Sequence, residues 1–295
     1  GSEMCIRDRA DRFVMIGDHH QLTPLVRDTD AAQHGMSVSL FQRLCKAHPS
    51  SVAMLCTQYR MNADIMALSN ALVYDGRLVC GNESVACAKF TMKRDACPSW
   101  LWDVLDPARP AVFVDTDAVK AVESRADTLV ENRVEAERIL RMSDVLIQAN
   151  VAAADIGILT PYRQQAKLLR DRCACEVLTV DQAQGRDWPV VLVSLVRSNK
   201  THTVGELLRD QRRVNVMITR AKTKLVLVGS YSTMIHGPCT EPMPALLPLL
   251  RMIQPKEPAD IPVHVSPGRQ RYVKKARRPT PVVTDLLNEQ DCIAE

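Results

Sequence analysis

Several short signals that identify complete sites are missing from this 295-residue chain. No Gly-Lys dipeptide occurs, so the chain holds no glycine-rich phosphate loop of the form G-x-x-x-x-G-K-[ST]. No Asp-Glu dipeptide occurs either, so the usual magnesium-holding carboxylate pair is absent. The ten cysteines include no C-x-x-C spacing, and we therefore expect no zinc or iron–sulfur site, in a reduced, intracellular chain.

Long apolar runs are missing as well. No stretch reaches the about 18 uninterrupted apolar residues of a membrane helix, and the N-terminus has no apolar segment typical of a secretory signal. The hydrophobic share of 46% and the charged share of 24% are ordinary for a soluble globular chain. The net charge is only +4, but residues 160–222 hold 12 Lys and Arg against 6 Asp and Glu. This local surplus favours a polyanionic partner such as nucleic acid or nucleotide phosphate.

Short apolar runs alternate with amphipathic stretches, which predicts an α/β fold with a parallel sheet covered by helices on both faces. The predicted strands cover residues 13–16, 52–55, 111–114, 156–159, 177–180, 190–196 and 224–229. The predicted helices cover residues 38–47, 62–73, 127–149, 162–172, 206–222 and 243–253.

Three segments fall outside this alternation. Residues 1–10 resemble a cloning scar or non-native leader, and residues 81–110, which include Trp100 and Trp102, are predicted to be an insertion. Prolines recur from position 255 onward and residues 269–278 carry six basic side chains, so residues 255–295 are predicted to form a flexible tail. A nuclear localisation signal, an extra electrostatic contact with DNA and a merely solvated tail all remain open for it.

Polar residues follow the predicted strands, and ligands of open α/β sheets bind at the carboxyl ends of strands. Gln21 lies in the loop GDHHQLTP after the first strand, where a glutamine can touch a terminal phosphate or orient water. Tyr59 and Arg60 follow the second strand, with a ring to stack on a base and a guanidinium to meet phosphate. A polar turn and a surface Tyr–Arg pair are the alternatives for these two motifs.

Two later loops offer similar groups. Thr160 and Tyr162 lie where a helix begins, and free backbone N–H groups there attract phosphates, although a plain helix start with Pro161 is the alternative. Gly185 lies among polar residues between two strands, which indicates close approach of the backbone to a ligand. Asp187 beside it can accept a hydrogen bond from a ribose hydroxyl or reach a metal through water.

The segment 212–222 is the most informative. Arg213 and Arg220 lie seven residues apart and are predicted to share one face of a helix whose other side is apolar. Two such arginines suit the arginine-finger role in phosphoryl transfer. A solvated basic helix face is the alternative, but it would normally include acids at i±4, and residues 211–222 contain none.

Taken together, these segments resemble superfamily 1 helicases of the up-frameshift/Dna-two group, and most closely the replication helicase–nucleases of the Dna-two type. The resemblance covers about residues 12–230 in five ordered motifs: GDHHQLTPLV, LCTQYRMNADIMALSNALVYDG, IGILTPYRQQ, TVDQAQGRDWPVVLVSLVRSN and VGELLRDQRRVNVMITRAKTKLVLVG. It implies a P-loop NTPase (RecA-like) fold. Residues 11–50 would end a first RecA-like domain, and residues 51–254 would form the second.

The resemblance implies a role for each candidate residue. Around ATP it implies catalytic roles for Arg220, Arg60, Gln21 and Arg213, and cofactor binding by Tyr59, Asp187, Gly185 and Gln184. Along a single nucleic-acid strand it places Thr160, Tyr162, Thr179, Arg197 and Asn199. No residue of this chain is predicted to bind a metal, because the ligands of Mg²⁺ would lie mainly outside it.

The implied function is the C-terminal part of a nuclear, ATP-dependent DNA helicase that moves 5′ to 3′ along single-stranded DNA. The remaining helicase domain and a nuclease domain would belong to the same parent protein, and this chain alone would show negligible ATPase activity. A cytoplasmic RNA helicase of the up-frameshift type and a non-catalytic RecA-like nucleic-acid-binding module are the alternatives. Asp187 favours the replication branch, because RNA-surveillance relatives usually carry Glu there; His20, Thr23, Ala183 and Trp188 depart from the common pattern.

Overall fold

The computed structural model describes residues 12–26, 28–126, 129–236, 246–253 and 255–256. The chain divides at residue 261, and the second unit, residues 262–295, lies outside the described residues. The predicted leader and almost all of the predicted tail therefore lie outside them too. Within the described part of the chain, no helix combines the length and apolar content that crossing a membrane requires.

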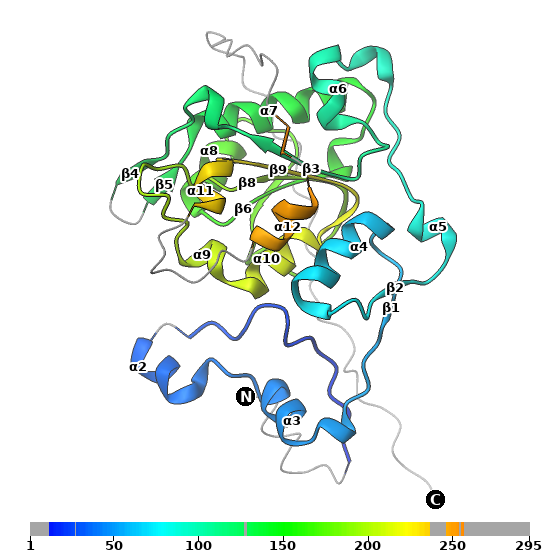
Figure 1. Ribbon diagram of the computed structural model, residues 1–295, viewed down its shortest axis with the longest axis vertical. Helices are drawn as coiled ribbons and strands as arrows, with labels where there is room; N and C mark the ends of the chain where they lie inside the picture. The colour runs from blue at the N-terminus through cyan, green and yellow to red at the C-terminus, as the bar shows by residue number, and fades with distance from the viewer. Residues whose placement is uncertain (1–11, 27, 127–128, 237–245, 254, 257–295) are drawn as a thin grey trace, which may run out of the picture. The chain divides into compact units, whose positions relative to one another are not determined.

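A six-stranded parallel sheet forms the centre of the first unit, in the order β10-β3-β9-β8-β6-β7 (Figure 1). Its strands are β3 (Ala111–Asp115), β6 (Ile156–Thr160), β7 (Glu176–Thr179), β8 (Trp188–Ser194), β9 (Ala221–Gly229) and β10 (Pro255–Lys256). Val, Ile and Leu dominate β6, β8 and β9, as is typical of strands that are buried on both faces. The sheet confirms the predicted parallel α/β architecture.

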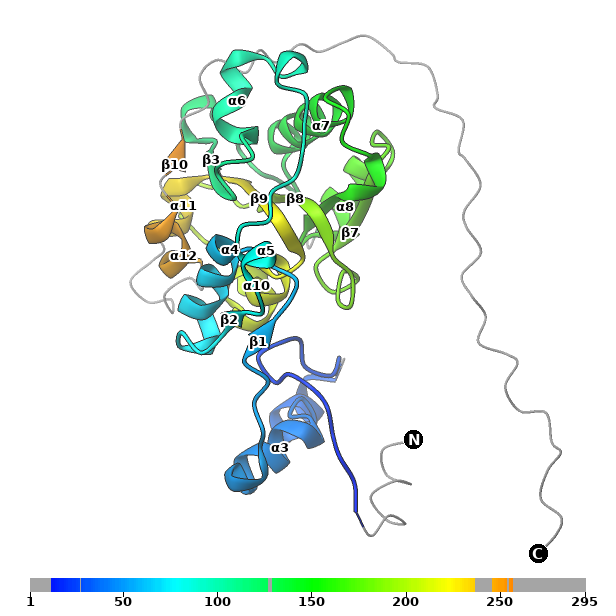
Figure 2. The ribbon, with the colours of Figure 1, turned by 90° about the vertical axis from the view of Figure 1, so that its right-hand side faces the viewer.

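Helices cover both faces of this sheet (Figure 2). One face carries α4 (Ala63–Ser69), α10 (Gln211–Ile218) and α12 (Leu247–Met252), packed on side chains such as Val191 and Val193. The other carries α6 (Ser99–Leu105), α7 (Arg133–Gln148) and α8 (Arg163–Arg170), packed on Val190 and Leu192. Successive residues of β8 thus enter different cores, because side chains alternate along a strand.

Shorter elements connect these layers. They are α2 (Thr29–Ala31), α3 (Leu40–Ala47), β1 (Thr57–Gln58), a π-helical turn (Asn70–Tyr74), β2 (Val79–Cys80), α5 (Glu83–Ala86), β4 (Ser124–Ala126), β5 (Leu129–Glu131), α9 (Glu206–Arg209) and α11 (Tyr231–Ile235). β1 pairs with β2, and β4 pairs with β5. The predicted insertion at 81–110 holds α5 and α6.

Two predicted strands, 13–16 and 52–55, are wrong. Both segments are extended but unpaired, and Val14, Ile16 and Leu55 expose 89%, 91% and 84% of their surface. A strand requires a neighbour for its backbone hydrogen bonds, and the described residues offer none at these positions. The apolar pattern alone therefore does not make a strand.

Two predicted helices begin or end differently. The helix expected over 127–149 begins only at Arg133, because the Asn132 side chain caps it and β5 precedes it. The helix expected over 206–222 is broken by Asp210, which caps α10. α10 ends at Ile218, so Arg220 lies in the turn before β9, and the prediction that Arg213 and Arg220 share a helix face is wrong.

At the C-terminal end, α12 confirms the helix predicted within 243–253, over Leu247–Met252. Pro255 and Lys256 pair with Phe113 and Val114 as β10, so the first described residues of the predicted tail belong to the sheet.

Candidate functional site

Four charged side chains gather at the amino ends of β8 and β9. Asp187 directly precedes β8 and Arg220 directly precedes β9, and the first residues of these strands pair with each other. Asp187 receives Arg60 Nε at 3.0 Å and Lys222 Nζ at 2.7 Å on its two carboxylate oxygens. We call Arg60, Asp187, Arg220 and Lys222 the amino-edge cluster. It lies at the edge of the sheet opposite to the carboxyl ends where a ligand site was expected.

Three cations share one carboxylate in the amino-edge cluster. Burial alone would raise the pKa of Asp187, but the hydrogen bond from Lys222 and the charges of Arg60, Lys222 and Arg220 outweigh it and lower this pKa. Burial, followed by the charge of Arg60, lowers the pKa of Arg220 to about 10. The cluster therefore carries a surplus of positive charge, as expected of a site for phosphate groups.

Arg220 is held differently from its neighbours. Only 2% of its surface is exposed. Its guanidinium donates to the carbonyl oxygens of Val216 (3.0 Å) and Arg186 (3.1 Å) and to Thr219 Oγ1 (3.0 Å). Arg213, predicted to support it, instead pairs with Asp181 and Asp210, both at 3.1 Å.

The loop that contains Gln21 is attached to α10 and to Tyr74. Gln21 Nε2 and the Tyr74 hydroxyl both donate to Asp18 Oδ2, at 2.9 Å and 2.6 Å. Asn215 Nδ2 donates to the Tyr74 hydroxyl (3.1 Å) and to the His20 carbonyl (3.0 Å). Burial and the contact with Asp18 raise the pKa of Tyr74. Asp18 thus holds the side chain of Gln21, while Tyr74 and Asn215 hold Asp18 and the backbone of the loop in turn.

Gln21 and Gln184 line one open pocket of about 360 Å³, together with Phe41 and Gln42. Gly185, next to Gln184, has a φ of +84° and open space where a Cβ would lie, so its backbone is accessible. Tyr59 is 67% exposed, and a Cβ on Gly81 would lie only 2.1 Å from its ring. The ring of Tyr59 therefore packs directly on the backbone of Gly81 and leaves its other face to solvent.

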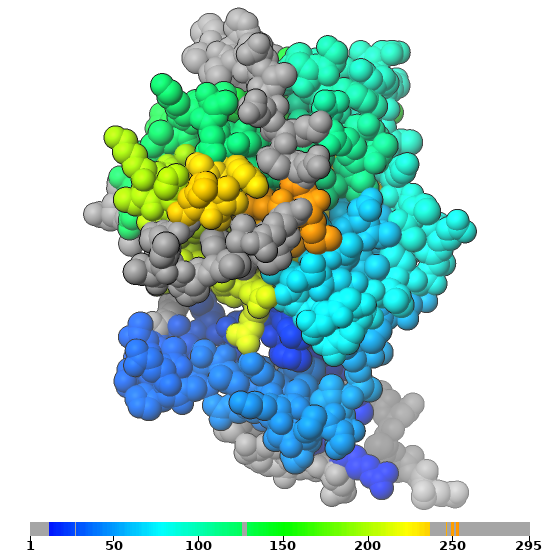
Figure 3. Space-filling model, in the orientation of Figure 1, coloured from blue at the N-terminus to red at the C-terminus, as the bar shows by residue number. Residues whose placement is uncertain are grey.

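The N-terminal segment that contains the Gln21 loop contacts α10. In Figure 3 the yellow-green segment of α9 and α10 reaches this blue N-terminal segment. Arg212 Nε donates to the carbonyl oxygen of His19 at 3.0 Å across this contact. The backbone of the Gln21 loop is thus bound to the first turn of α10.

The residues predicted to contact nucleic acid gather at the carboxyl ends of the strands. Thr160 and Thr179 end β6 and β7 and pair in register, but both are buried. Tyr162 stands at the N-terminal end of α8 without capping it through its side chain, and burial raises the pKa of Tyr162. The structure thus brings the predicted residues to one edge, while it turns most of their side chains inward.

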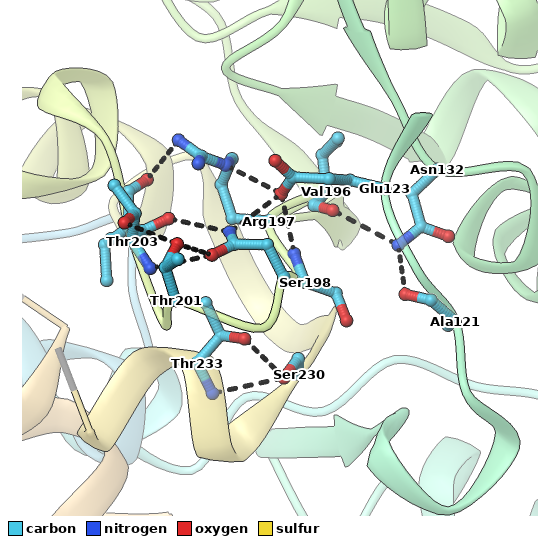
Figure 4. Close-up of polar contacts among 12 residues, drawn as sticks. Ala121, Glu123, Asn132, Val196, Arg197, Ser198, Thr201, Thr203, Ser230 and Thr233 are labelled. Carbon is cyan, nitrogen blue, oxygen red and sulfur yellow. Dashed lines mark hydrogen bonds and ion pairs between the residues drawn. The ribbon is translucent and has the colours of Figure 1, made fainter. Parts of the chain in front are cut away.

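One carboxylate organises this edge (Figure 4). Glu123 Oε2 accepts hydrogen bonds from Arg197 Nε (2.8 Å), the Ser198 N–H (2.9 Å) and Asn199 Nδ2 (3.1 Å). The side chains of Glu123 and Arg197 are each only 7% exposed. Arg197 and Asn199 are therefore bound internally rather than presented to solvent.

Val196, just before Arg197, is held in the same way. Its N–H donates to Glu135 Oε2 at 2.8 Å, and its carbonyl accepts from Asn132 Nδ2 at 3.1 Å. Burial raises the pKa of Glu135 to about 8 against the opposing effect of its hydrogen bonds with Ser194 and Val196. We call Glu123, Asn132, Glu135, Val196, Arg197 and Asn199 the carboxyl-edge network.

Sequence reasoning missed Lys222, Glu123, Tyr74 and Asn215. Lys222 carried a signal, because it lies two residues after Arg220 in a segment without acids. Glu123 carried none, because it lies 74 positions from Arg197 and meets it only in the folded chain.

The model of the family described as AAA domain matches residues 36–232. The DNA replication ATP-dependent helicase/nuclease JHS1 of Arabidopsis thaliana is 45% identical over 235 residues, which are 78% of this chain and 18% of that protein. The helicase/nuclease DNA2 of Homo sapiens is 45% identical over 80% of this chain and 24% of its own length. DNA2 of Saccharomyces cerevisiae is 40% identical over 76% of this chain and 16% of its own length.

These matches confirm the resemblance drawn from the ordered motifs. The chain spans about a fifth of the length of these relatives. Among solved structures, the C-terminal domain of a possible DNA helicase from Lactobacillus overlaps 59% of this chain and 88% of its own, at 12% identity and a TM-score of 0.32.

Proposed function

Because the chain belongs to the AAA domain family, we propose that it forms the C-terminal part of an ATP-dependent DNA helicase that moves 5′ to 3′ along single-stranded DNA. The amino-edge cluster is the observation that carries this proposal. Arg60 and Lys222 expose 38% and 41% of their side chains, and within the described part of the chain Asp187 is the only carboxylate with which they form ion pairs. Such a site attracts a phosphate chain, since enzymes of phosphoryl transfer act mainly by positioning and by neutralising charge.

The residues of this chain take distinct parts in the proposed reaction. Arg60 and Lys222 bind phosphate oxygens, which releases Asp187 to accept a hydrogen bond from a ribose hydroxyl. Gln21, fixed by Asp18, senses the terminal phosphate, and the exposed face of Tyr59 stacks on the base. Arg220 neutralises the transferred phosphoryl group, which requires its guanidinium to exchange a carbonyl partner for a phosphate oxygen. Arg213, Gln184 and Gly185 are proposed to complete the wall of this site.

Magnesium would neutralise charge on the β- and γ-phosphates when ATP is bound. Within the described part of the chain, no three His, Cys, Asp or Glu side chains form a group that could hold a metal ion. We therefore propose no metal ligand among them.

The carboxyl edge is proposed to hold the DNA strand, through the surface around Tyr162 and the loop 197–203. The names of the relatives refer to DNA replication, which supports DNA over RNA and a place in the nucleus. The rest of the helicase and a nuclease are proposed as parts of the same parent protein.

ATP hydrolysis by the full-length parent protein tests this function. We expect stimulation by oligo(dT) well above that by oligo(U), and unwinding of a duplex with a 5′ single-stranded tail but not of one with a 3′ tail. Stimulation by RNA alone would replace the proposal with an RNA helicase. Absence of hydrolysis with either strand would leave a non-catalytic binding module.

A further inference from the structure

The loop that follows β8 begins in a conformation that its own sequence disfavours. Val196 has a φ of +71°, a region that β-branched residues rarely adopt. Its N–H and its carbonyl are bound by the buried side chains of Glu135 and Asn132, which come from the start of α7. The direction in which the chain leaves β8 is therefore set by another segment.

Glu123 then fixes the next three residues. Its carboxylate binds Arg197, Ser198 and Asn199, and its own N–H donates to the Ser198 carbonyl at 3.0 Å. All three side-chain and backbone donors meet the same oxygen, Oε2. Since the side chain of Glu123 is only 7% exposed, little water competes for these hydrogen bonds.

The far end of the loop is tied back to the same arginine. Arg197 Nη1 donates to the Val204 carbonyl at 3.1 Å. Gly205 has a φ of +82°, and a Cβ there would lie 2.2 Å from Arg197 Nη1 and 3.4 Å from the Tyr162 hydroxyl. The loop thus closes around Arg197 and ends against Tyr162.

Only the tip of this loop faces solvent. Lys200 and Thr201 are exposed, and Thr201 Oγ1 donates to Asn199 Oδ1 at 2.8 Å. Asn199 Oδ1 also accepts from the Thr203 N–H at 2.9 Å, which holds the tip in a tight turn (Figure 4). The Thr201 hydroxyl gives its only proton to Asn199, so the donor that this exposed tip offers to phosphate oxygens is the Lys200 ammonium.

We infer that Glu123 is a positioning residue that sets the loop 197–203 so that Lys200, rather than Arg197 and Asn199, contacts the backbone of a single DNA strand. This inference rests on the proposed function. It assigns the strand contact to a residue that the motifs did not identify, and it gives Arg197 and Asn199 an internal role. The contact is made with phosphates and not with bases. Binding should therefore be independent of the DNA sequence, and its affinity should depend on the salt concentration.

Fluorescence anisotropy of labelled oligo(dT), titrated with the purified 295-residue chain, tests the inference. We expect Glu123→Gln to raise the Kd about tenfold, in the range for residues that act through others, and Glu123→Asp to recover part of the loss. Lys200→Ala should raise the Kd and lower the slope of log Kd against log salt by about one, because one phosphate contact is lost. Lys93→Ala is the matched control and should change neither, because Lys93 is exposed and its N–H donates to the Ala149 carbonyl, at the end of α7 away from Glu135.

Thermal unfolding of each variant separates folding from binding. Lys200→Ala should unfold at the wild-type temperature, so its weaker binding would support the loop contact even if Glu123→Gln failed to fold. Tighter binding by Glu123→Gln would overturn the inference, because Glu123 would then compete with phosphate for Arg197. Unchanged binding by Lys200→Ala, or no binding by the wild-type chain, would overturn it as well and leave the proposed function to its own test in the full-length parent protein.

Discussion

The two edges of the sheet use arginine in opposite ways. At the amino edge, three cations share Asp187, and two of them are about two-fifths exposed. At the carboxyl edge, Arg197 and Glu123 are each 7% exposed, and the donors around Glu123 are all used internally. A surplus of exposed charge indicates a surface that binds a ligand, whereas a saturated buried pair indicates a scaffold that shapes one.

Removal of Arg220 should have the largest effect. In the full-length parent protein, Arg220→Ala should lower ATP hydrolysis by about 10³–10⁵-fold, as for arginine fingers in other NTPases, while ATP binding stays close to normal. Hydrolysis and binding of a fluorescent ATP analogue measure the two effects separately. Arg172→Ala, a surface arginine paired with Glu137, is the control. Normal turnover in Arg220→Ala would remove the catalytic role of the amino edge.

The second largest effect is expected on the free energy of unfolding, where removal of the carboxylate should have different consequences at the two edges. Glu123→Ala leaves Arg197 buried without its partner and should lower the free energy of unfolding by about 3–5 kcal/mol. Asp187→Ala breaks partly exposed pairs and should cost only about 0–1 kcal/mol. Urea unfolding of the 295-residue chain measures both. Equal losses in the two variants would contradict the distinction between ligand surface and scaffold.

The edges should also respond to pH in opposite directions. Glu135 has a pKa of about 8 in the folded chain against 4.5 as a free group, so the folded state retains a proton that the unfolded state releases. The free energy of unfolding should therefore fall between about pH 4.5 and pH 8, by up to about 1.4 kcal/mol per pH unit. Glu135→Gln should make the free energy of unfolding less dependent on pH in this range, which urea unfolding at several pH values measures.

Asp187 has a lowered pKa, so its contribution is present above its ordinary pKa of 3.8 and is lost as the pH falls below it. Asp187→Asn should therefore lower the free energy of unfolding slightly at pH values above 3.8, and its difference from the wild type should shrink in acid. A slope between pH 4.5 and pH 8 that survives Glu135→Gln would assign that slope to another group.

Two glycines give the smallest and most closely matched comparison. Gly185 and Gly205 have φ values of +84° and +82°, so alanine at either position should cost about 1 kcal/mol in backbone strain. A Cβ at Gly185 meets open space, whereas one at Gly205 would collide with Arg197. Gly205→Ala should therefore lower the unfolding temperature more than Gly185→Ala, and the reverse order would mean that the loop after β8 is loosely held.

The buried strands of the fold could be predicted from sequence, whereas the N-terminal segment and the helix boundaries could not. The apolar runs of β6, β8 and β9 specify buried parallel strands, and together with the AAA domain family they confirm the expected RecA-like class. Residues 13–16 carry a similar pattern but remain unpaired, because strand formation depends on a neighbour. The break at Asp210 was missed because one capping side chain outweighs the helical period around it.

The site divides in the same way. Motif order brought Arg60, Asp187 and Arg220 to notice, and the fold places them together. Motif order also selected Arg197 and Asn199, but whether a polar side chain faces solvent depends on partners distant in sequence. Arg197 is buried because it pairs with Glu123, and no pattern in the sequence around Arg197 indicates this pair.

The attachment of the Gln21 loop to α10 has a mechanical consequence. Arg212 and Asn215 bind the carbonyl oxygens of His19 and His20, and two residues after α10 ends comes Arg220. The helix α10 is short, and the turn that follows its far end carries the buried guanidinium of Arg220. We therefore expect a displacement of the Gln21 loop to reach Arg220 through the backbone of α10.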